Sequence, residues 1–120
     1  MSSILIVDDN PDILFAAKLL LKQHYDVVKT TDTPFDIEEI LVEQTIDVIL
    51  LDMNFTQDSI SGQEGFYWLK KILKQDPSVV VLLMTAYSDI QLAVDTIKAG
   101  ASDFISKPWK NDQLLGAVAA

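Results

Sequence analysis

The chain has 120 residues, is 49% hydrophobic and carries a net charge of −9. This length and apolar content fit one globular domain, and the scattered lysines exclude the basic surface that direct nucleic-acid binding requires. The absence of cysteine excludes disulfides and thiolate metal sites. Because no apolar run approaches the ~20 residues of a membrane span and no signal-peptide pattern is present, we expect a cytoplasmic protein that does not contact membranes.

The first half of the chain alternates short apolar runs with helical patterns. Strands are predicted over residues 3–7, 25–29 and 46–51, since short apolar runs are typical of buried strands. Helices are predicted to begin at Asn10-Pro11 and Thr33-Pro34, where a polar N-cap precedes a proline that suits the first helical position.

The second half continues the alternation. A helix is predicted over residues 63–74, followed by a strand over 79–83 that is wholly apolar and therefore expected to be buried on both faces. A helix over 89–99 is expected to end at Gly100, a residue type that favours helix C-caps. The last two elements are a strand over 103–106 and a helix that begins near Lys110.

Alternation of this kind predicts an α/β fold with a parallel sheet and helices on both faces. We expect the flavodoxin-like doubly wound (βα)5 sandwich with strand order 2-1-3-4-5, whose ligand site lies at the carboxyl edge beside strands 1 and 3. Residues 1–120 form a single domain in this interpretation. The last helical pattern ends without a cap or polar stop, so we expect the domain to be the N-terminal part of a longer protein.

Charged side chains follow three of the predicted strands. Asp8 and Asp9 follow the first strand, Asp52 the third and Lys107 the fifth. The carboxyl ends of parallel strands meet at one edge, so these groups should converge on one pocket. Gathered carboxylates repel each other unless a cation neutralises them, and Mg²⁺ prefers such oxygen ligands. The sequence therefore predicts a metal-dependent site for a phosphoryl group.

The residues around these positions resemble the receiver domain of two-component response regulators. The matching segments are Ile-Val-Asp8-Asp9-Asn10, Leu-Leu-Asp52-Met53-Asn54, Met84-Thr85-Ala86-Tyr87 and Phe104-Ile-Ser-Lys107-Pro108-Trp109. They occur in the family's order and span essentially the whole chain, and they look most like receivers that precede a σ54-activating ATPase. One departure is the loop over residues 53–65, which is longer than is usual and lacks a proline.

The resemblance implies a role for each site residue. Asp52 is the expected phosphoacceptor, which a sensor histidine kinase phosphorylates. Asp8, Asp9 and Asp52 are expected to hold Mg²⁺ together with the backbone carbonyl of Asn54. Lys107, aimed inward by a cis bond to Pro108, and the hydroxyl of Thr85 are expected to bind phosphoryl oxygens. Asn54 and Tyr87 flank the nucleophile, where they favour slow loss of the phosphoryl group.

Thr85 and Phe104 are the switch residues that the resemblance implies. They are expected to move on phosphorylation and to change the face formed by the fourth helix, the fifth strand and the fifth helix. That face would control an output domain or effector protein, or form a phosphorylation-linked homodimer. For Phe104, ordinary core packing is the alternative.

Three other functions remain open. Asp52-Met-Asn-Phe-Thr56 distantly resembles the nucleophile motif of haloacid-dehalogenase-type phosphatases, although Asn54 replaces the acid that protonates leaving groups. A flavin carrier of the same fold conflicts with Asp8 and Asp9, which would repel a flavin phosphate. A degenerate receiver conflicts with the intact motif positions. The favoured interpretation is a phosphoacceptor switch and not an enzyme, with at most self-phosphorylation and slow autodephosphorylation.

Overall fold

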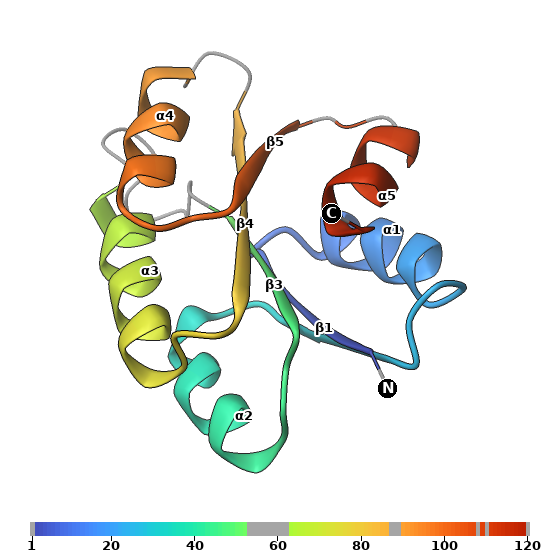
Figure 1. The fold of residues 1–120 in the computed structure, drawn as a ribbon. Helices are drawn as coiled ribbons and strands as arrows, with labels where there is room; N and C mark the ends of the chain where they lie inside the picture. Colours follow the sequence, from blue (N-terminus) through green and yellow to red (C-terminus); the bar gives the residue numbers. More distant parts are fainter. Residues whose placement is uncertain (1, 53–62, 87–89, 108, 110, 120) are drawn as a thin grey trace.

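The computed structural model describes residues 2–52, 63–86, 90–107, 109 and 111–119. Five parallel strands form one sheet in the order β2-β1-β3-β4-β5 (Figure 1). The strands are β1 (Ser3–Val7), β2 (Val27–Thr31), β3 (Val48–Asp52), β4 (Val80–Ala86) and β5 (Asp103–Lys107). The helices are α1 (Pro11–Leu21), the 3₁₀ turn η1 (Pro34–Asp36), α2 (Ile37–Glu43), α3 (Gln63–Gln75), α4 (Ile90–Lys98) and α5 (Asn111–Ala119). The predicted flavodoxin-like order is confirmed.

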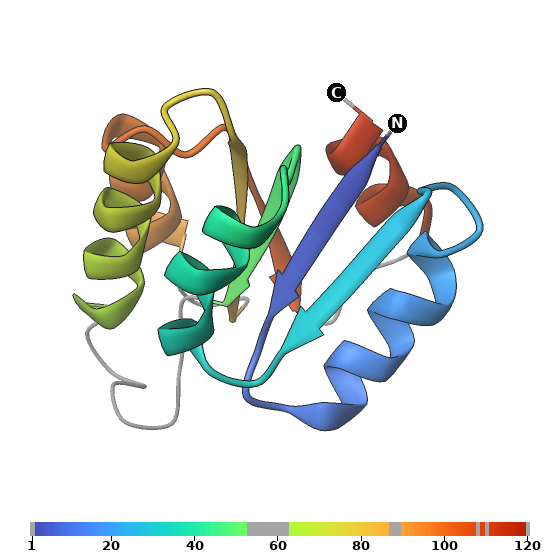
Figure 2. The same cartoon turned by 90° about the horizontal axis from the view of Figure 1, so that it is seen from below.

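The helices form two layers around the sheet. Figure 2 shows α1 and α5 on one face and α2, α3 and α4 on the other. Alternate strand residues point to opposite faces, so the sheet supports two cores. Leu5, Ile49 and Leu83 pack with side chains of α2 and α3, while Ile4, Leu50 and Leu82 pack with side chains of α1 and α5. Burial on both faces explains why β1 and β3 are continuous apolar runs.

Local sequence signals set the ends of two helices as predicted. The Asn10 side chain caps α1 by accepting a hydrogen bond from the Asp12 N–H at 2.9 Å, and Pro11 is the first helical residue. Gly100 follows α4 with a φ of +121°, a backbone conformation that costs glycine little. A Cβ at Gly100 would lie 2.7 Å from Cδ1 of Leu73, so a larger residue would also have to displace the end of this side chain of α3.

The second strand begins later than predicted. It covers Val27–Thr31 instead of residues 25–29, because Ser3 pairs with Val27 and Val7 pairs with Thr31 in the parallel register. Tyr25 remains part of the turn after α1, since its N–H donates to the Leu21 carbonyl at 3.0 Å. Its hydroxyl donates to the Val118 carbonyl at 3.0 Å and joins this turn to α5.

The other strands differ from the prediction at their ends. β3 begins at Val48 and extends to Asp52, and β4 continues through Met84 and Thr85 to Ala86. The prediction that the fourth strand is wholly buried was wrong at Val80, which is 36% exposed. Val80 is the first residue of β4 and lies at the end of the sheet where the strands begin. No helix within the described ranges has the length and apolar character needed to cross a membrane.

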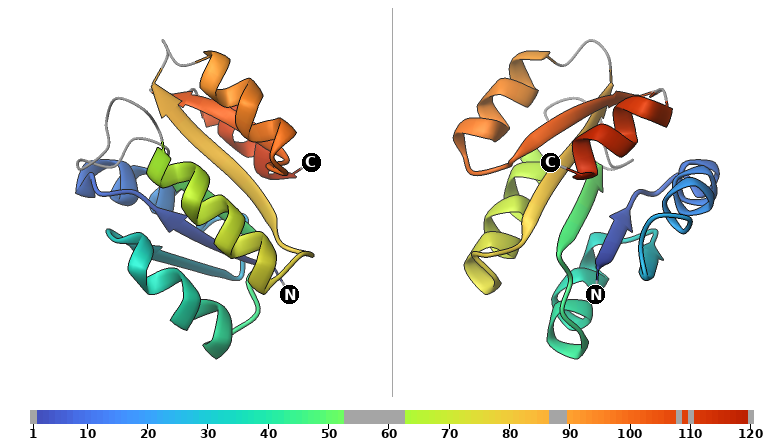
Figure 3. Two further views of the ribbon diagram at one scale, coloured as in Figure 1. Left: turned by 90° about the vertical axis from the view of Figure 1, so that its left-hand side faces the viewer. Right: turned by 45° about the vertical axis from the view of Figure 1, so that its right-hand side comes forward.

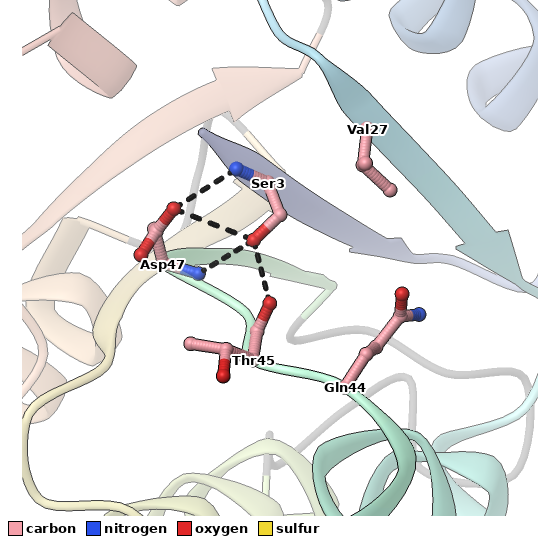
Figure 4. A pocket seen from close by; sticks show the side chains of 5 residues that line it. All are labelled: Ser3, Val27, Gln44, Thr45 and Asp47. Atoms are coloured by element: carbon pink, nitrogen blue, oxygen red, sulfur yellow. Dashed lines mark hydrogen bonds between the residues drawn. The ribbon is translucent and has the colours of Figure 1, made fainter. Parts of the chain in front are cut away.

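Hydrogen bonds fix the amino ends of β1 and β3 to each other (Figure 4). The Asp47 Oδ2 atom accepts from the Ser3 N–H at 2.9 Å, and the Ser3 Oγ atom donates to the Thr45 carbonyl at 2.8 Å. The Asp47 N–H donates to Ser3 Oγ at 3.2 Å. We call this edge of the sheet the amino rim and the opposite edge, where the strands end, the carboxyl rim.

Candidate functional site

The strand register brings the predicted aspartates together at the carboxyl rim. Val7 pairs with Leu51, so Asp8 and Asp52, the next residue of each segment, lie at the same level. Asp52 pairs with Met84 on the other side of β3. The two central strands therefore deliver acids from widely separated parts of the sequence to one place.

Asp8, Asp9 and Asp52 form a compact acidic cluster. One carboxylate oxygen from each lies within 4.8 Å of the others. Asp8 and Asp52 are fully buried, and Asp9 is half-buried. Charged carboxylates at this spacing and degree of burial repel each other strongly, since the low local dielectric weakens screening. The cluster therefore favours a bound cation.

Backbone hydrogen bonds position Asp8. Its N–H donates to the carbonyl of Thr31 at the end of β2 at 3.2 Å. Its Oδ1 atom accepts from the N–H of Asn10 at 2.9 Å. The role of Thr31 was missed in the sequence, because a backbone carbonyl leaves no signal in the residue type.

The donor set of the acidic cluster fits Mg²⁺. This ion takes hard oxygen ligands at about 2.1 Å, so two oxygens on one ion are at most about 4.2 Å apart. The 4.8 Å limit on the oxygen separations is close to this value, and a shift of tenths of an ångström or one bridging water completes the fit. Asp8, Asp9 and Asp52 are the described residues that can hold the ion.

Thr85 and Lys107 lie at the carboxyl rim, because Thr85 is near the end of β4 and Lys107 is the last residue of β5. Thr85 follows Met84, the partner of Asp52, and pairs with Ser106, while Lys107 pairs with Ala86. The structure describes the backbone of both residues but not their side chains. Asn54, Tyr87 and Pro108 lie outside the described residues, so their predicted roles remain predictions.

Phe104, in β5, is neither fully buried nor fully exposed. It pairs with Leu83 in β4, and its half-buried side chain packs against the core on the α2 and α3 side of the sheet. Partial burial is compatible with core packing and with a ring that changes its position. Both interpretations given above therefore remain.

The chain matches a protein-family model and several known proteins. The response regulator receiver domain model matches residues 4–119. The alginate biosynthesis transcriptional regulatory protein AlgB of Pseudomonas putida is 35% identical over 116 residues, which are 97% of this chain and 25% of the relative. The DNA-binding transcriptional regulator NtrC of Escherichia coli is 30% identical over 113 residues, which are 94% of this chain and 23% of the relative.

A solved structure agrees with the fold. The N-terminal signal receiver domain of a two-component response regulator from Bacteroides fragilis is 46% identical, covers 99% of this chain and 94% of its own, and has a TM-score of 0.90. None of these three relatives is a haloacid-dehalogenase phosphatase, so that alternative gains no support. The chain spans about a quarter of the length of the two transcriptional regulators. With its family match, its strand order and its acidic cluster, the chain belongs to the receiver domains of two-component response regulators.

Proposed function

We propose that Asp52 accepts a phosphoryl group from a phosphohistidine of a sensor histidine kinase. The observation that carries this proposal is the position of Asp52, a fully buried acid at the end of β3 beside Asp8 and Asp9. A buried carboxylate needs a compensating cation. A site that binds a cation beside a nucleophile is suited to receiving an anionic group.

The transfer exchanges one bond to phosphorus for another. An oxygen of the Asp52 carboxylate attacks phosphorus to form an acyl phosphate, and the bond from phosphorus to the histidine nitrogen breaks. The nitrogen retains the electron pair and takes a proton from solvent. Asp8, Asp9, Asp52 and the Asn54 carbonyl would hold Mg²⁺, whose positive charge would offset the repulsion between carboxylate and phosphoryl oxygens.

Lys107 and Thr85 complete the proposed site. The Lys107 ammonium is a compact charge suited to a phosphoryl oxygen, and the Thr85 hydroxyl is a hydrogen-bond donor. The register supports both roles, since Thr85 follows the partner of Asp52 and Lys107 pairs with the residue after Thr85. The domain acts as a switch in which the acyl phosphate is the signal, with no turnover beyond self-phosphorylation and slow autodephosphorylation.

Phosphorylation replaces the single negative charge of the Asp52 carboxylate with a phosphoryl group of charge about −2 at neutral pH, and it brings new hydrogen-bond acceptors beside Thr85. We propose that Thr85 moves toward this anion and that Phe104 follows, so that the surface of α4, β5 and α5 changes. This two-state element then controls an output domain or effector, or forms a phosphorylation-linked homodimer.

The output is proposed from the relatives. Because those regulators are about four times as long as the matched segment, we propose that this chain is the N-terminal receiver of a longer cytoplasmic regulator with a σ54-activating ATPase. A separate domain, and not this acidic one, would contact DNA. This proposal gives transcription regulation as the outcome of phosphorylation.

The Asp52→Asn variant tests the proposal. Incubation with acetyl phosphate and Mg²⁺ should add one phosphoryl group to the unmodified chain, which intact-protein mass spectrometry detects, and should add none to the variant. Asp47→Asn is the matched control, because it removes an acid at the opposite rim while keeping an oxygen that can accept from Ser3. Mg²⁺-dependent labelling of the Asp52→Asn chain would show that another residue is the acceptor.

A further inference from the structure

The outer surface of α2 and α3 carries apolar side chains that no described element covers. Phe35 is 72% exposed, Val42 79% and Tyr67 53%. Together with Glu38 and Lys71 they form what we call the α2–α3 patch. It lies on the face of the sheet opposite α1 and α5, and Figure 3 shows α2 and α3 side by side on that face. Grouped exposed apolar residues are typical of interaction surfaces.

The aromatic side chains of the patch are held in fixed positions. The rings of Phe35 and Tyr67 both pack edge-to-face on Trp68, with centroids 5.4 and 5.1 Å from its ring. Trp68 is only 4% exposed and anchors them to the core. The Lys71 Nζ atom lies 5.2 Å from the Tyr67 ring centre and 5.4 Å from that of Trp68. Side chains ordered in advance lose little entropy when a partner binds.

Charge divides the patch into two halves. On the α2 side, Glu38, Glu39 and Glu43 are acidic, whereas the α3 side carries Lys70, Lys71 and Lys74. The Lys71 Nζ atom lies 2.7 Å from Glu38 Oε1, and this hydrogen bond raises the pKa of Lys71 above its usual value. The raised pKa keeps Lys71 charged at neutral pH. A surface with opposite charges on its two halves is complementary to a copy of itself.

We propose that the α2–α3 patch is a homodimer interface whose partner is a second copy of this chain. The two helices run in the same direction, since α2 follows β2 and α3 follows β3 in one parallel sheet (Figure 3). A two-fold axis in the plane of the interface, parallel to the helices and between them, places α2 of each copy on α3 of the other. Acidic α2 then meets basic α3 twice.

The same axis leaves the height of each residue along the helices unchanged. Residues that are neighbours across the patch within one copy therefore become neighbours between copies. Glu38 meets Lys71 of the second copy, and the two intramolecular pairs become a network of four charges. Phe35, which reaches Trp68 beside Tyr67, meets Tyr67 of the second copy. Aromatic contacts with charged pairs beside them are typical components of an interface.

This interface does not depend on the phosphorylation proposed for Asp52. The patch lies on α2 and α3, whereas the proposed output surface is formed by α4, β5 and α5. The Asp52→Asn chain should therefore dimerise as the unmodified chain does. A dimer that appears only after phosphorylation would belong to the output surface and would contradict the inference for α2 and α3.

Charge reversal tests the pairing between copies. Glu38→Lys and Lys71→Glu each place like charges at two symmetric contacts, so sedimentation velocity should show association weakened by about tenfold or more for each variant. An equimolar mixture should recover dimers, because a chain with two lysines then faces a chain with two glutamates. The mixture restores only contacts between chains, since both variants have lost the pair within the chain.

Two further variants keep the experiment decisive. Phe35→Ser should also weaken the dimer, and Lys22→Glu on α1 should leave it unchanged; far-UV circular dichroism verifies that every variant is folded. The inference is overturned if the unmodified chain stays monomeric at millimolar concentration, if the single charge reversals still dimerise as tightly, or if their mixture does not associate. If the chain is monomeric, the partner that binds the α2–α3 patch is a different protein.

Discussion

The two rims of the sheet use aspartate in opposite ways. At the amino rim, the Asp47 carboxylate accepts hydrogen bonds from Ser3, including one of 2.9 Å from its N–H. At the carboxyl rim, Asp8, Asp9 and Asp52 bring carboxylate oxygens within 4.8 Å of each other. The same residue type therefore stabilises one strand end by accepting from Ser3 and adds repulsion at the other, where three acids stand close together.

This difference separates a structural acid from the acids of the candidate site. Replacing Asp47 with alanine removes the acceptor of two donors of Ser3, and the fold should lose stability. Neutralising an acid of the carboxyl-rim cluster relieves repulsion, and the fold should gain stability while the site loses its cation. The sign of the stability change, measured without metal, distinguishes the two rims.

The largest effect is expected for Mg²⁺ binding by Asp9→Asn. The amide removes one negative oxygen ligand while keeping the volume of the side chain, so affinity should fall by about tenfold to a hundredfold. Isothermal titration calorimetry measures it, and Asp47→Asn should bind as the unmodified chain does. Unchanged affinity in Asp9→Asn, or a loss in both variants, would remove the distinction between the rims.

Gly100→Ala should produce the next largest change, at the amino rim. The methyl group meets Leu73 at 2.7 Å and forces a side chain onto a backbone with φ of +121°, so the chain should lose about 2 kcal/mol of unfolding free energy. Urea denaturation followed by fluorescence measures this loss, and Mg²⁺ affinity should not change. Gly116→Ala is the control, because nothing lies within 4 Å of a Cβ there.

Asp47→Ala should destabilise the fold by about 1 kcal/mol, because the Ser3 N–H and hydroxyl lose an acceptor in a part-buried place. Asp47→Asn keeps an oxygen and should lose less. The comparison uses the same urea titration without metal. Equal stability of the alanine variant and the unmodified chain would mean that water replaces the carboxylate and that the amino rim does not depend on it.

The smallest effect, of opposite sign, is expected for Asp8→Asn in the presence of EDTA. The amide can still accept from the Asn10 N–H and removes one charge from the cluster, so stability should rise by about 0.5–1 kcal/mol. Added Mg²⁺ should stabilise the unmodified chain, since only the folded state offers the site, and should stabilise the variant less. A loss of stability in EDTA would show that the cluster is not held under repulsion.

Several features of the fold followed directly from local sequence. The Asn10 cap, Pro11 and Gly100 marked helix ends correctly, since capping depends on residues a few positions apart. The strand order also followed, because alternating apolar runs and helices leave few arrangements of a parallel sheet. The start of β2 could not be predicted from local sequence. It depends on the pairing of Val27 with Ser3 rather than on the apolar residues of β2 itself.

The candidate site was predictable to the level of residue type and strand end. Asp8, Asp9 and Asp52 could be named because each follows a strand, and parallel strands end at one edge. The hydrogen bond from Asp8 to the Thr31 carbonyl could not be predicted, since every residue has a carbonyl. The α2–α3 patch was also missed, because Phe35 and Tyr67 have helical neighbours that look like ordinary packing positions.

The sequence by itself determined which chemical groups the domain has and at which strand ends they stand, because periodicity and capping act over a few residues. Only the tertiary structure decided that three carboxylates approach within 4.8 Å, that Asp47 is satisfied by Ser3, and that Trp68 holds two exposed rings on one surface. These contacts join residues that are far apart in the chain, and the register of the sheet and the packing of its helices fix their distances.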